Sequence, residues 1–365
     1  MVVRLTPSDT LFFRTGRPFT MGSESWADCL FPPFPRTLYG ALRTFLIFQR
    51  GTLEEFYGGK YEEDLGTPEK KGKMVIRGPL LSREENLYFP VPRDLVVLKG
   101  GKKELVPLAL QELKREVFVS DWGTECTLVY RGEGIAEEAE GWLEECSLRT
   151  YLQGGTGVKD LELRDGRELF REEPRIGIAR DRQTLTAREG YLYRIPMVRL
   201  EEGVALLLEV EGVQDFPKRG ILRLGGEGKV VFLESVQGNL RERLGSFWNS
   251  GECQDSEIFK VYLVTPAIFR RGYLPEWIGD DFRGKKEGLE LQLLGAAVGK
   301  PLPVGGWDMS RSTPKEVRRA VPAGSVYYFR LLGGRWDEVI RTFHFQNISD
   351  IDPEEGFGLS LVGRV

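Results

Sequence analysis

The chain opens with Val3-Arg4-Leu5-Thr6-Pro7 and continues to Phe13-Arg14-Thr15-Gly16. The same pattern returns far along the sequence as Val261-Tyr262-Leu263-Val264-Thr265-Pro266, followed by Phe269-Arg270-Arg271-Gly272. A short apolar run bounded by a turn signal predicts a buried strand. An internal repeat of this kind predicts that two halves of the chain share one architecture, each beginning with an equivalent strand.

A second pair of matching segments follows each of these strands. Residues 38–42 read Leu-Tyr-Gly-Ala-Leu, and residues 293–297 read Leu-Leu-Gly-Ala-Ala. We interpret both as helices that pack closely through their small residues. The offset between the repeats changes little along the chain, which indicates a duplicated unit with small insertions and deletions.

The ends of the halves match as well. The first half has a strand at 204–210, a helix-compatible segment, a glycine loop at 224–229 and a strand at 230–233. The second half has a strand at 325–331, a helix at 336–345, a glycine loop at 355–358 and a strand at 359–362. Together with the opening strands and helices, these elements give each half the order βαββαβ. This is the ferredoxin-like or RRM-like split motif, and it occurs twice. The predicted class is therefore α+β, with two ferredoxin-like domains in tandem.

The first domain is expected at 1–245, with a long insertion around 81–175, and the second domain at 256–365. The polar stretch 249–255 is the expected linker. Within the insertion, Ala136 to Ser147 is predicted to form an acidic helix that faces solvent or a protein partner.

Composition excludes several classes of protein. The 365 residues contain a single histidine, His344, so a two-histidine metal site cannot form. The four cysteines show no CxxC spacing, which disfavours a zinc site and fits a reducing compartment. No apolar run is long enough to span a membrane, and we expect a soluble, cytoplasmic protein without a cofactor.

The net charge of −4 argues against a general nucleic-acid binder, but it conceals strong local contrasts. Residues 132–147 carry a charge of −6, whereas residues 171–199 carry +3 and residues 300–330 carry +4. A solvated face is the ordinary explanation for such blocks. Strips built mainly from arginine, with glycine and aromatic residues interleaved, point instead to phosphate binding.

Several motifs, taken in order, resemble one family. They are 31–43 (FPPFPRTLYGALR), 174–184 (PRIGIARDRQT), 189–194 (EGYLYR), 224–228 (LGGEG), 265–269 (TPAIF), 305–308 (GGWD), 318–327 (RRAVPAGSVY) and 356–363 (GFGLSLVG). The segment at 31–43 is similar to the first-helix signature of the RAMP proteins of CRISPR systems. More narrowly, the chain resembles the third subunit of the type III-B (Cmr) effector complex, from end to end and least in residues 50–170.

The resemblance implies a binding subunit of a ribonucleoprotein rather than an enzyme. Members of that family hold the repeat-derived 5′ tag of the CRISPR RNA, and they dock against the large polymerase-like subunit beside the backbone RAMP subunits. The backbone subunits cut the target RNA. The implied partners are therefore CRISPR RNA, the large subunit and a neighbouring backbone subunit.

Candidate RNA contacts begin at Arg36 and Thr37, just before the first helix. A helix N-terminus favours a phosphate, and an arginine can bind that phosphate through two hydrogen bonds. The alternative is a capping Thr37 beside a solvent-facing Arg36.

The densest polar motif comprises Arg175, Arg180, Arg182 and Thr184, around Asp181. These arginines are expected to reach the RNA backbone or to stack on splayed bases of the tag. An internal network of arginine and aspartate ion pairs is the alternative.

The glycine loop Gly225, Gly226 and Gly228, with Lys229, is expected to end a helix and to let backbone N–H groups approach phosphates. A plain tight turn is the alternative. Gly305, Gly306 and Trp307 offer a flat aromatic ring beside flexible backbone, and Trp307 is a candidate to stack on a base. A core position is the alternative, because a tryptophan so close to a strand is more often in the core.

Lys315, Arg318 and Arg319 precede the strand at 325 and are the candidates for salt-sensitive contacts to the RNA backbone.

Two catalytic alternatives stay open. A metal-independent, CRISPR-RNA-processing endoribonuclease of the RAMP group needs a general base, and His344 is the only histidine that the chain offers. A nucleotidyltransferase needs paired acids on adjacent strands, and Asp280-Asp281 is the only Asp-Asp dipeptide in the sequence. We interpret His344 as a core or capping residue and the aspartate pair as part of a loop turn.

Overall fold

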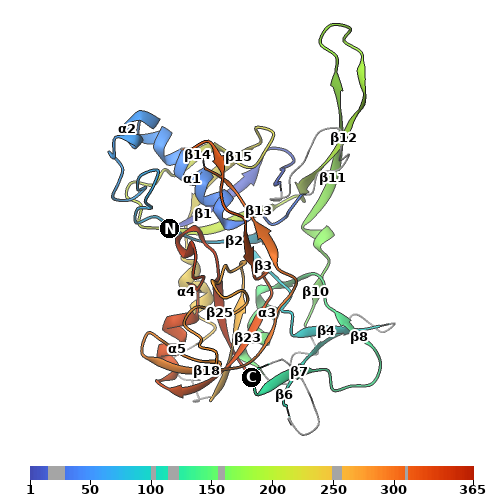
Figure 1. The fold of residues 1–365 in the computed structure, drawn as a ribbon, viewed down its shortest axis with the longest axis vertical. Coiled ribbons are helices and arrows are strands. Elements are labelled where there is room, and N and C mark those ends of the chain that lie inside the picture. Colours follow the sequence, from blue (N-terminus) through green and yellow to red (C-terminus); the bar gives the residue numbers. More distant parts are fainter. Residues whose placement is uncertain (15–28, 100–103, 114–122, 155–160, 249–256, 309–310) are drawn as a thin grey trace.

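A computed structural model describes residues 1–14, 29–99, 104–113, 123–154, 161–248, 257–308 and 311–365. The predicted linker at 249–255 lies outside these ranges. The described chain is mostly β, with several sheets and few helices, which corrects the expected α+β class toward β (Figure 1). None of the helices in the described ranges is long and apolar enough to cross a membrane.

The first half of the chain forms an eight-stranded sheet in which every described pairing is antiparallel. Across the sheet the strands are β10 (Leu163–Arg164), β9 (Trp142–Glu144), β3 (Asn86–Pro90), β2 (Val75–Arg83), β13 (Val204–Glu211), β1 (Val2–Pro7), β15 (Val230–Val236) and β14 (Arg219–Arg223). The N-terminal strand β1 is central, because Val2 pairs with Glu209 on one side and with Val236 on the other.

The second half forms a six-stranded antiparallel sheet. Its strands are β17 (Arg283–Lys286), β18 (Leu289–Ala297), β23 (Val326–Gly333), β16 (Ile258–Leu263), β25 (Leu359–Arg364) and β24 (Gln346–Asn347). The order β25-β16-β23-β18 repeats the order β15-β1-β13-β2 of the first sheet. The two opening strands of the sequence repeat, β1 and β16, therefore occupy equivalent central positions.

The helix α1 (Pro35–Arg50) covers one face of the first sheet (Figure 1). Pro35 begins the helix in its first turn, where a missing N–H costs nothing, and Gly51 ends it by donating its N–H to the Ile47 carbonyl at 2.9 Å. Leu38 and Leu42 recur at helical spacing and are buried against Leu5 of the sheet. Gly40 is exposed, so the predicted close packing through small residues is wrong for this helix.

Two of the predicted helices are strands. Residues 293–297 belong to β18, where Leu291 and Leu293 are buried in one cluster and Leu294 in another. A strand buried on both faces has a continuous apolar run, which periodicity alone does not distinguish from a helix. The helix-compatible segment after residue 210 contains β14 instead, and Gly212, with φ of +74°, interrupts any helix there.

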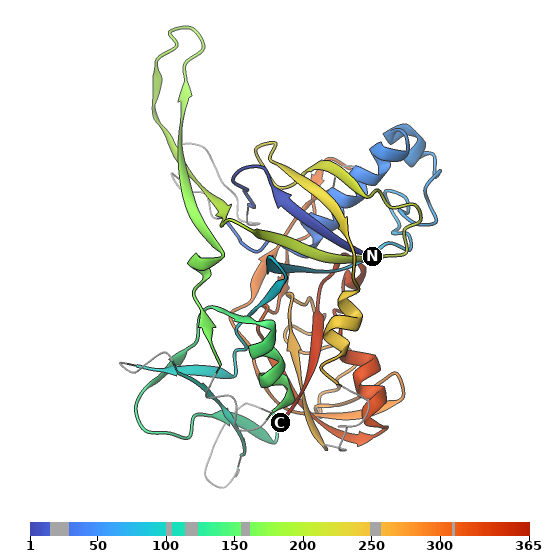
Figure 2. The ribbon, with the colours of Figure 1, turned by 180° about the vertical axis from the view of Figure 1, so that it is seen from behind.

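The remaining helices flank the two sheets. They are α2 (Leu53–Tyr57), α3 (Glu145–Gln153), α4 (Leu240–Gly245) and α5 (Trp336–Phe343), with a short 3₁₀ turn η3 (Pro353–Glu355). The prediction of a helix at 336–345 is confirmed by α5. Figure 2 shows α3, α4 and α5 around the lower sheet.

The expected acidic helix from Ala136 to Ser147 is wrong over most of its length. The segment forms β8 (Ala136–Glu138) and β9, and helix α3 begins only at Glu145. Gly141 has a φ of +145°, and a Cβ atom there would lie 2.5 Å from the Arg164 carbonyl, which precludes a continuous helix. Ion pairs also partly neutralise this segment, including Glu137 with Lys99 at 3.2 Å.

Smaller sheets surround this core. They are β4 (Leu95–Leu98) with β5 (Leu105–Pro107) and β8, β6 (Ala109–Glu112) with β7 (Cys126–Val129), β19 (Leu302–Val304) with β22 (Arg318–Ala320), and β20 (Trp307–Asp308) with β21 (Thr313–Pro314). The longest ribbon, β11 (Phe170–Arg180) with β12 (Ala187–Leu200), projects well beyond the body in both views (Figures 1 and 2). We call this ribbon the arm.

The two halves share one hydrophobic cluster. Leu80 and Leu207 of the first sheet belong to the same buried cluster as Tyr262, Leu294 and Leu361 of the second. Because apolar area removed from water stabilises the folded state in proportion to that area, this cluster joins the halves into one packed body.

Candidate nucleic-acid interface

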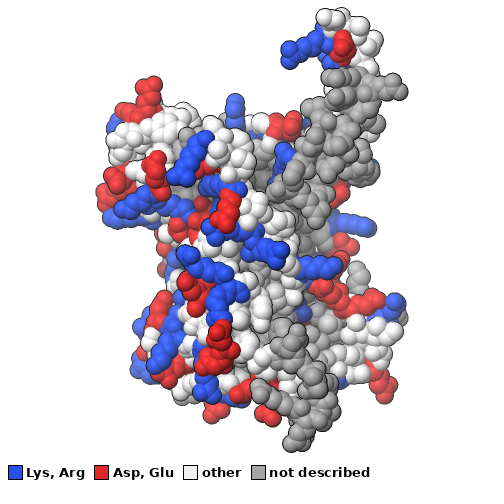
Figure 3. All heavy atoms as spheres, viewed as in Figure 1, with Lys and Arg blue, Asp and Glu red and all other residues white. Residues whose placement is uncertain are grey.

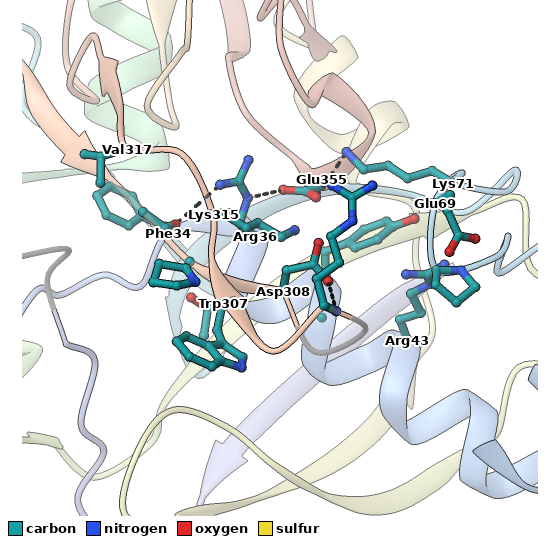
Figure 4. Close-up of a pocket in the computed structure, with 18 of the residues that line it drawn as sticks. Phe34, Arg36, Arg43, Glu69, Lys71, Trp307, Asp308, Lys315, Val317 and Glu355 are labelled. Carbon is teal, nitrogen blue, oxygen red and sulfur yellow. Dashed lines mark hydrogen bonds and ion pairs between the residues drawn. The ribbon is translucent and has the colours of Figure 1, made fainter. Parts of the chain in front are cut away.

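A groove runs past the first turns of α1 (Figure 4). It consists of two cavities of about 1040 and 830 Å³, whose linings share Arg14, Phe34, Thr37, Gly40 and Trp307. Half of the residues that the sequence assigned to RNA lie along it: Arg36, Thr37, Gly225, Gly226, Gly305, Gly306, Trp307 and Lys315. The fold thus brings together segments from both halves of the chain.

The start of α1 forms part of the groove wall. The Thr37 N–H donates to the Phe34 carbonyl at 2.9 Å, and no side chain caps this end of the helix. A Cβ atom on Gly40 would meet nothing within 4 Å, so the helix surface is open there.

Cationic side chains dominate the groove. Eight Lys and Arg residues line the two cavities: Arg14, Arg36, Arg43, Lys70, Lys71, Arg223, Arg311 and Lys315. Only three acidic residues join them, Glu69, Asp308 and Glu355. Elsewhere basic and acidic side chains are interspersed, as Figure 3 shows for one face. A positive groove in a chain of net charge −4 favours an anionic ligand at this place.

Five of the groove's cations have no ion-pair partner among the described residues. Arg43 donates instead to the Leu65 and Thr67 carbonyls, which leaves Lys70, Arg223, Arg311 and Lys315. The first three are exposed, and Lys315 is half-buried. These side chains remain available for phosphate groups, whose neutralisation supplies much of the affinity for RNA.

Arg36, in contrast, is held inside the chain. Its Nε donates to Glu355 at 2.7 Å, its Nη2 pairs with Asp352, and its Nη1 donates to the Gly305 carbonyl at 3.3 Å. Lys71 contacts Glu355 at 3.1 Å, and Figure 4 shows both cations converging on that carboxylate. We call Arg36, Lys71, Asp352, Glu354 and Glu355 the latch, because it ties the start of α1 to η3 in the second half.

The latch fixes its charges. Burial opposes the charge on Lys71, but the negative charge of Glu355 and a hydrogen bond to Asp352 raise the pKa of Lys71 above its usual range. Only 14% of the Arg36 side chain is exposed. The sequence suggested two arrangements for Arg36, a side chain free to bind a phosphate or a side chain that faces solvent. The structure shows neither.

Trp307 lies on the short β20–β21 hairpin, at the junction of the two cavities. It is 55% exposed, so the expectation of a core position is wrong. Backbone bonds hold the hairpin, including the one from the Lys315 N–H to the Gly306 carbonyl at 2.9 Å. The ring is thus presented on a fixed backbone without being packed away.

The glycine loop forms the turn between β14 and β15 and does not end a helix. Gly225 has a φ of +80°, and a Cβ atom there would lie 2.4 Å from the Phe12 carbonyl. The Gly226 N–H donates to the same carbonyl at 2.8 Å, so this amide is already satisfied. The backbone of Gly225 and Gly226 borders the second cavity, whereas Gly228 is not part of either lining.

Arg175 and Lys229 meet at Asp9, where the base of the arm joins the first sheet. Arg175 lies 3.0 Å from Asp9, Lys229 lies 2.9 Å from it, and Arg199 completes the cluster at 3.1 Å. The hydrogen bond from Lys229 holds the pKa of Asp9 well below its usual range. Arg175 therefore takes part in an internal ion-pair network, the alternative left open for its motif, and Lys229 joins the same network.

Arg180, Arg182 and Thr184 lie at the far end of the arm. Asp181 accepts hydrogen bonds from the backbone N–H groups of Gln183 and Thr184, both at 2.9 Å, and so organises the turn. Both arginines are exposed and have no ion-pair partner in the part of the chain that the structure describes.

Arg318 and Arg319 lie on β22, outside both cavity linings. Arg318 pairs with Glu316 at 2.7 Å, and Arg319 is exposed.

The residues of the catalytic alternatives have structural roles. His344 is 5% exposed; its Nδ1 accepts hydrogen bonds from Trp248 Nε1 and the Val362 N–H, both at 3.2 Å. Its Nε2 lies 3.0 Å from the Leu244 carbonyl, and burial lowers the pKa of His344 to about 4. This confirms the interpretation of a core histidine.

Asp280 pairs with Arg271, and Asp281 accepts the Arg283 N–H at 3.1 Å within a loop, as expected for a turn. Within the described ranges, no cluster of His, Cys, Asp and Glu side chains is arranged to hold a metal ion.

Comparison with known proteins identifies the family. The family model described as CRISPR-associated protein (Cas_Cmr3) matches residues 3–365. The chain belongs to the Cmr3 family. The resemblance found in the sequence motifs is thereby confirmed. A search of curated proteins gave no match.

Solved structures are similar to this Cmr3-family chain at low sequence identity. A chain in the cryo-EM structure of the type III-B Cmr-beta complex bound to cognate target RNA is 18% identical, with a TM-score of 0.51 over 90% of this chain and 86% of that one. The same complex with AMPPnP gives 17% identity and a TM-score of 0.49 over the same shares. A chain of the type III-A Csm3–Csm4 subcomplex gives 12% and 0.38, over 91% and 94%. At such identities, the match to the target-RNA complex indicates a common fold.

Six cations of the groove were not predicted as RNA contacts from the sequence: Arg14, Arg43, Lys70, Lys71, Arg223 and Arg311. The run Glu69-Lys70-Lys71-Gly72-Lys73 was a usable signal, because clustered lysines between turn residues indicate an exposed basic loop. Arg43 lay in the quoted helix motif, but its two hydrogen bonds to the carbonyls of Leu65 and Thr67 depend on tertiary contacts.

Proposed function

We propose that this protein is a non-catalytic subunit of a type III-B Cmr interference complex and holds the 5′ tag of the CRISPR RNA in the groove beside α1. The observation that carries the proposal is the groove itself, which gathers half of the predicted RNA residues and eight cations in a chain of net negative charge. Membership of the Cmr3 family supports it. Through such a complex the protein would contribute to antiviral defence.

The proposed partners follow from the family. They are the CRISPR RNA, the large polymerase-like subunit and the neighbouring backbone RAMP subunit. Arg180, Arg182 and Thr184 on the arm, and Arg318 and Arg319 on β22, lie outside the groove and are proposed as contacts to parts of the RNA that leave it. We assign Arg175, Gly228 and Lys229 to holding the arm and the β14–β15 turn in place beside the RNA.

We also infer that both halves are ferredoxin-like units that have each lost one helix. The first keeps α1 and has β14 where the second helix is expected. The second keeps α5 and has no helix between β16 and β18, a segment that the structure describes in full. The shared strand order supports this inference, with domains at 1–245 and 256–365 and the insertion at 81–175.

Binding of the intact chain to CRISPR RNA with and without its tag tests the proposed function. The RNA is titrated at two salt concentrations, alone and with the large subunit, and is then examined for cleavage. We expect tag-dependent binding without product. The variant Lys70→Ala/Arg223→Ala/Lys315→Ala removes three unpaired groove cations and should weaken binding by at least tenfold.

The matched control also removes three cations, Arg219→Ala/Lys285→Ala/Arg341→Ala. All three are exposed, form ion pairs and lie elsewhere on the surface. The control should bind as the unchanged protein does. Equal binding of tagged and untagged RNA, or metal-independent cleavage, would contradict the proposal and favour a processing nuclease.

A further inference from the structure

We propose that Trp307 stacks on one unpaired nucleobase of the RNA and thereby sets which nucleotide lies at the junction of the two cavities. This inference rests on the proposed function, because it requires RNA in the groove. It adds the residue that fixes the register of the strand along that groove.

The exposure of Trp307 is the first observation. Trp307 is 55% exposed, whereas Trp142 and Trp336 are 8% and 3% exposed. An indole ring is the largest apolar side chain, and leaving it in water forfeits the stabilisation that burial would give. Exposed aromatic rings that lie among cationic side chains are typical of surfaces that bind single-stranded nucleic acid.

The rigidity of its support is the second observation. The Gly306 carbonyl accepts the Lys315 N–H at 2.9 Å, and the Gly305 carbonyl accepts a hydrogen bond from the Arg36 guanidinium at 3.3 Å. Arg36 is itself held by Glu355 at 2.7 Å. The latch therefore positions the loop that carries Trp307, and the ring needs little ordering when a base arrives.

The position of the ring between unpaired cations is the third observation. Lys70, Arg311 and Lys315 line the first cavity, Arg223 lines the second, and Trp307 lines both. A strand that crosses the junction can place phosphates on both sides of the ring and one base against it. Within a duplex both faces of a base are already stacked, so the geometry selects an unpaired nucleotide.

The test pairs Trp307→Ala with a set of tagged RNAs, each lacking the base of one tag nucleotide. Affinities for the full chain are measured by fluorescence anisotropy at low salt. We expect one abasic position to weaken binding to the unchanged protein roughly 5- to 100-fold, and Trp307→Ala to weaken binding of intact RNA similarly. Trp307→Ala should not weaken the binding of that abasic RNA any further, because the base and the ring act on each other. This non-additivity assigns the base to Trp307.

Two further variants separate stacking from loss of structure. Trp307→Phe keeps an aromatic face and should retain most of the affinity, whereas Tyr57→Ala removes an aromatic side chain that is 50% exposed on α2, outside both cavities, and should change nothing. Two results would overturn the inference: Trp307→Ala weakens the binding of every abasic RNA equally, or it does not weaken RNA binding at all. In either case Lys70→Ala/Arg223→Ala/Lys315→Ala would still impair binding, so the proposed function would stand. Trp307-dependent binding of a blunt duplex would overturn the requirement for an unpaired base. If neither Trp307→Ala nor the triple cation variant weakens binding, the proposed function fails as well.

Discussion

Arg36 stands at a helix start, where residue type and position both favour a phosphate, yet its donors are occupied by Glu355, Asp352 and the Gly305 carbonyl. The partners of Arg36 lie more than 260 residues away in the chain, so only the tertiary fold reveals them. At this scale the sequence identifies which side chains have the right chemistry, and the structure decides which of them are still available.

Arg36→Ala should destabilise the folded state by about 3 kcal/mol, because it leaves the nearly buried Glu355 with Lys71 as its only close cation among the described residues. Urea unfolding of the purified chain measures the change. Arg318→Ala, which removes an exposed ion pair, should cost less than about 1 kcal/mol. Equal effects of the two substitutions would show that the latch adds nothing to stability.

His344 should make stability depend on pH. Its pKa is lowered by burial to about 4 in the folded chain, against an ordinary value of 6.5. Between these values the unfolded chain takes up a proton that the folded chain refuses, so stability is complete above pH 6.5 and falls as the pH drops toward 4. The loss reaches roughly 3 kcal/mol. Unfolding of the unchanged protein and of His344→Gln at pH 7 and pH 4.5 measures it, and the difference between pH values should shrink in the variant.

The elements show where pattern analysis succeeds and fails. The helices predicted at 38–42 and 336–345 are confirmed by α1 and α5, although α1 packs through one apolar side rather than through its small residues. The prediction of a helix at 293–297 is wrong because β18 is buried on both faces, so its sequence does not alternate between apolar and polar residues. The prediction of a helix before the glycine loop is wrong because pairing with β15, rather than the residues of β14 themselves, makes this segment a strand.

The β14–β15 turn allows a prediction for a single element. Gly225→Ala should destabilise the protein by about 2 kcal/mol or more, because the residue has a positive φ and its Cβ would collide with the Phe12 carbonyl. Gly228→Ala also meets a positive φ of +63° but open space, so it should cost only about 1 kcal/mol. Thermal unfolding of both variants gives the order, and a reversed order would contradict the described turn.

For the whole molecule, the decisive arrangement is the convergence of both halves on one groove. The repeat in the sequence predicted that two similar halves exist, and it predicted the six strands β1, β13, β15, β16, β23 and β25. It could not predict how the halves face each other, because that depends on the shared cluster of Leu80, Leu207 and Leu361, whose members are unremarkable apolar residues in the sequence. Half of the site was therefore found by residue type, and its assembly only by the fold.

The groove predicts the salt dependence of RNA binding. Each unpaired cation that contacts a phosphate releases a counterion, so the slope of log affinity against log salt should fall by about 0.7 for each one removed. Single alanine variants of Lys70, Arg223 and Lys315 should each reduce the slope by that amount. The slope of Lys285→Ala should stay unchanged, and a matching fall there would point to a diffuse effect of net charge.

Asp94 is expected to hold the insertion to the second half. It is fully buried and accepts hydrogen bonds from Tyr151 at 2.6 Å and Tyr328 at 2.5 Å, close to the buried Lys260. Asp94→Ala leaves two buried hydroxyl groups without an acceptor and should cost about 3 kcal/mol. The same substitution in a Tyr328→Phe background should cost less, as a double-mutant cycle of unfolding free energies would show.

The central place of β1 has a consequence for the making of the protein. Val2 pairs with Glu209 and Val236, so after β1 leaves the ribosome more than two hundred further residues must be made before both of its neighbours exist. Until then its apolar side chains have no sheet to join, and contacts so distant in sequence form slowly. The nascent chain is thus most exposed to aggregation during the synthesis of its own insertion, and that interval is when a chaperone would matter most.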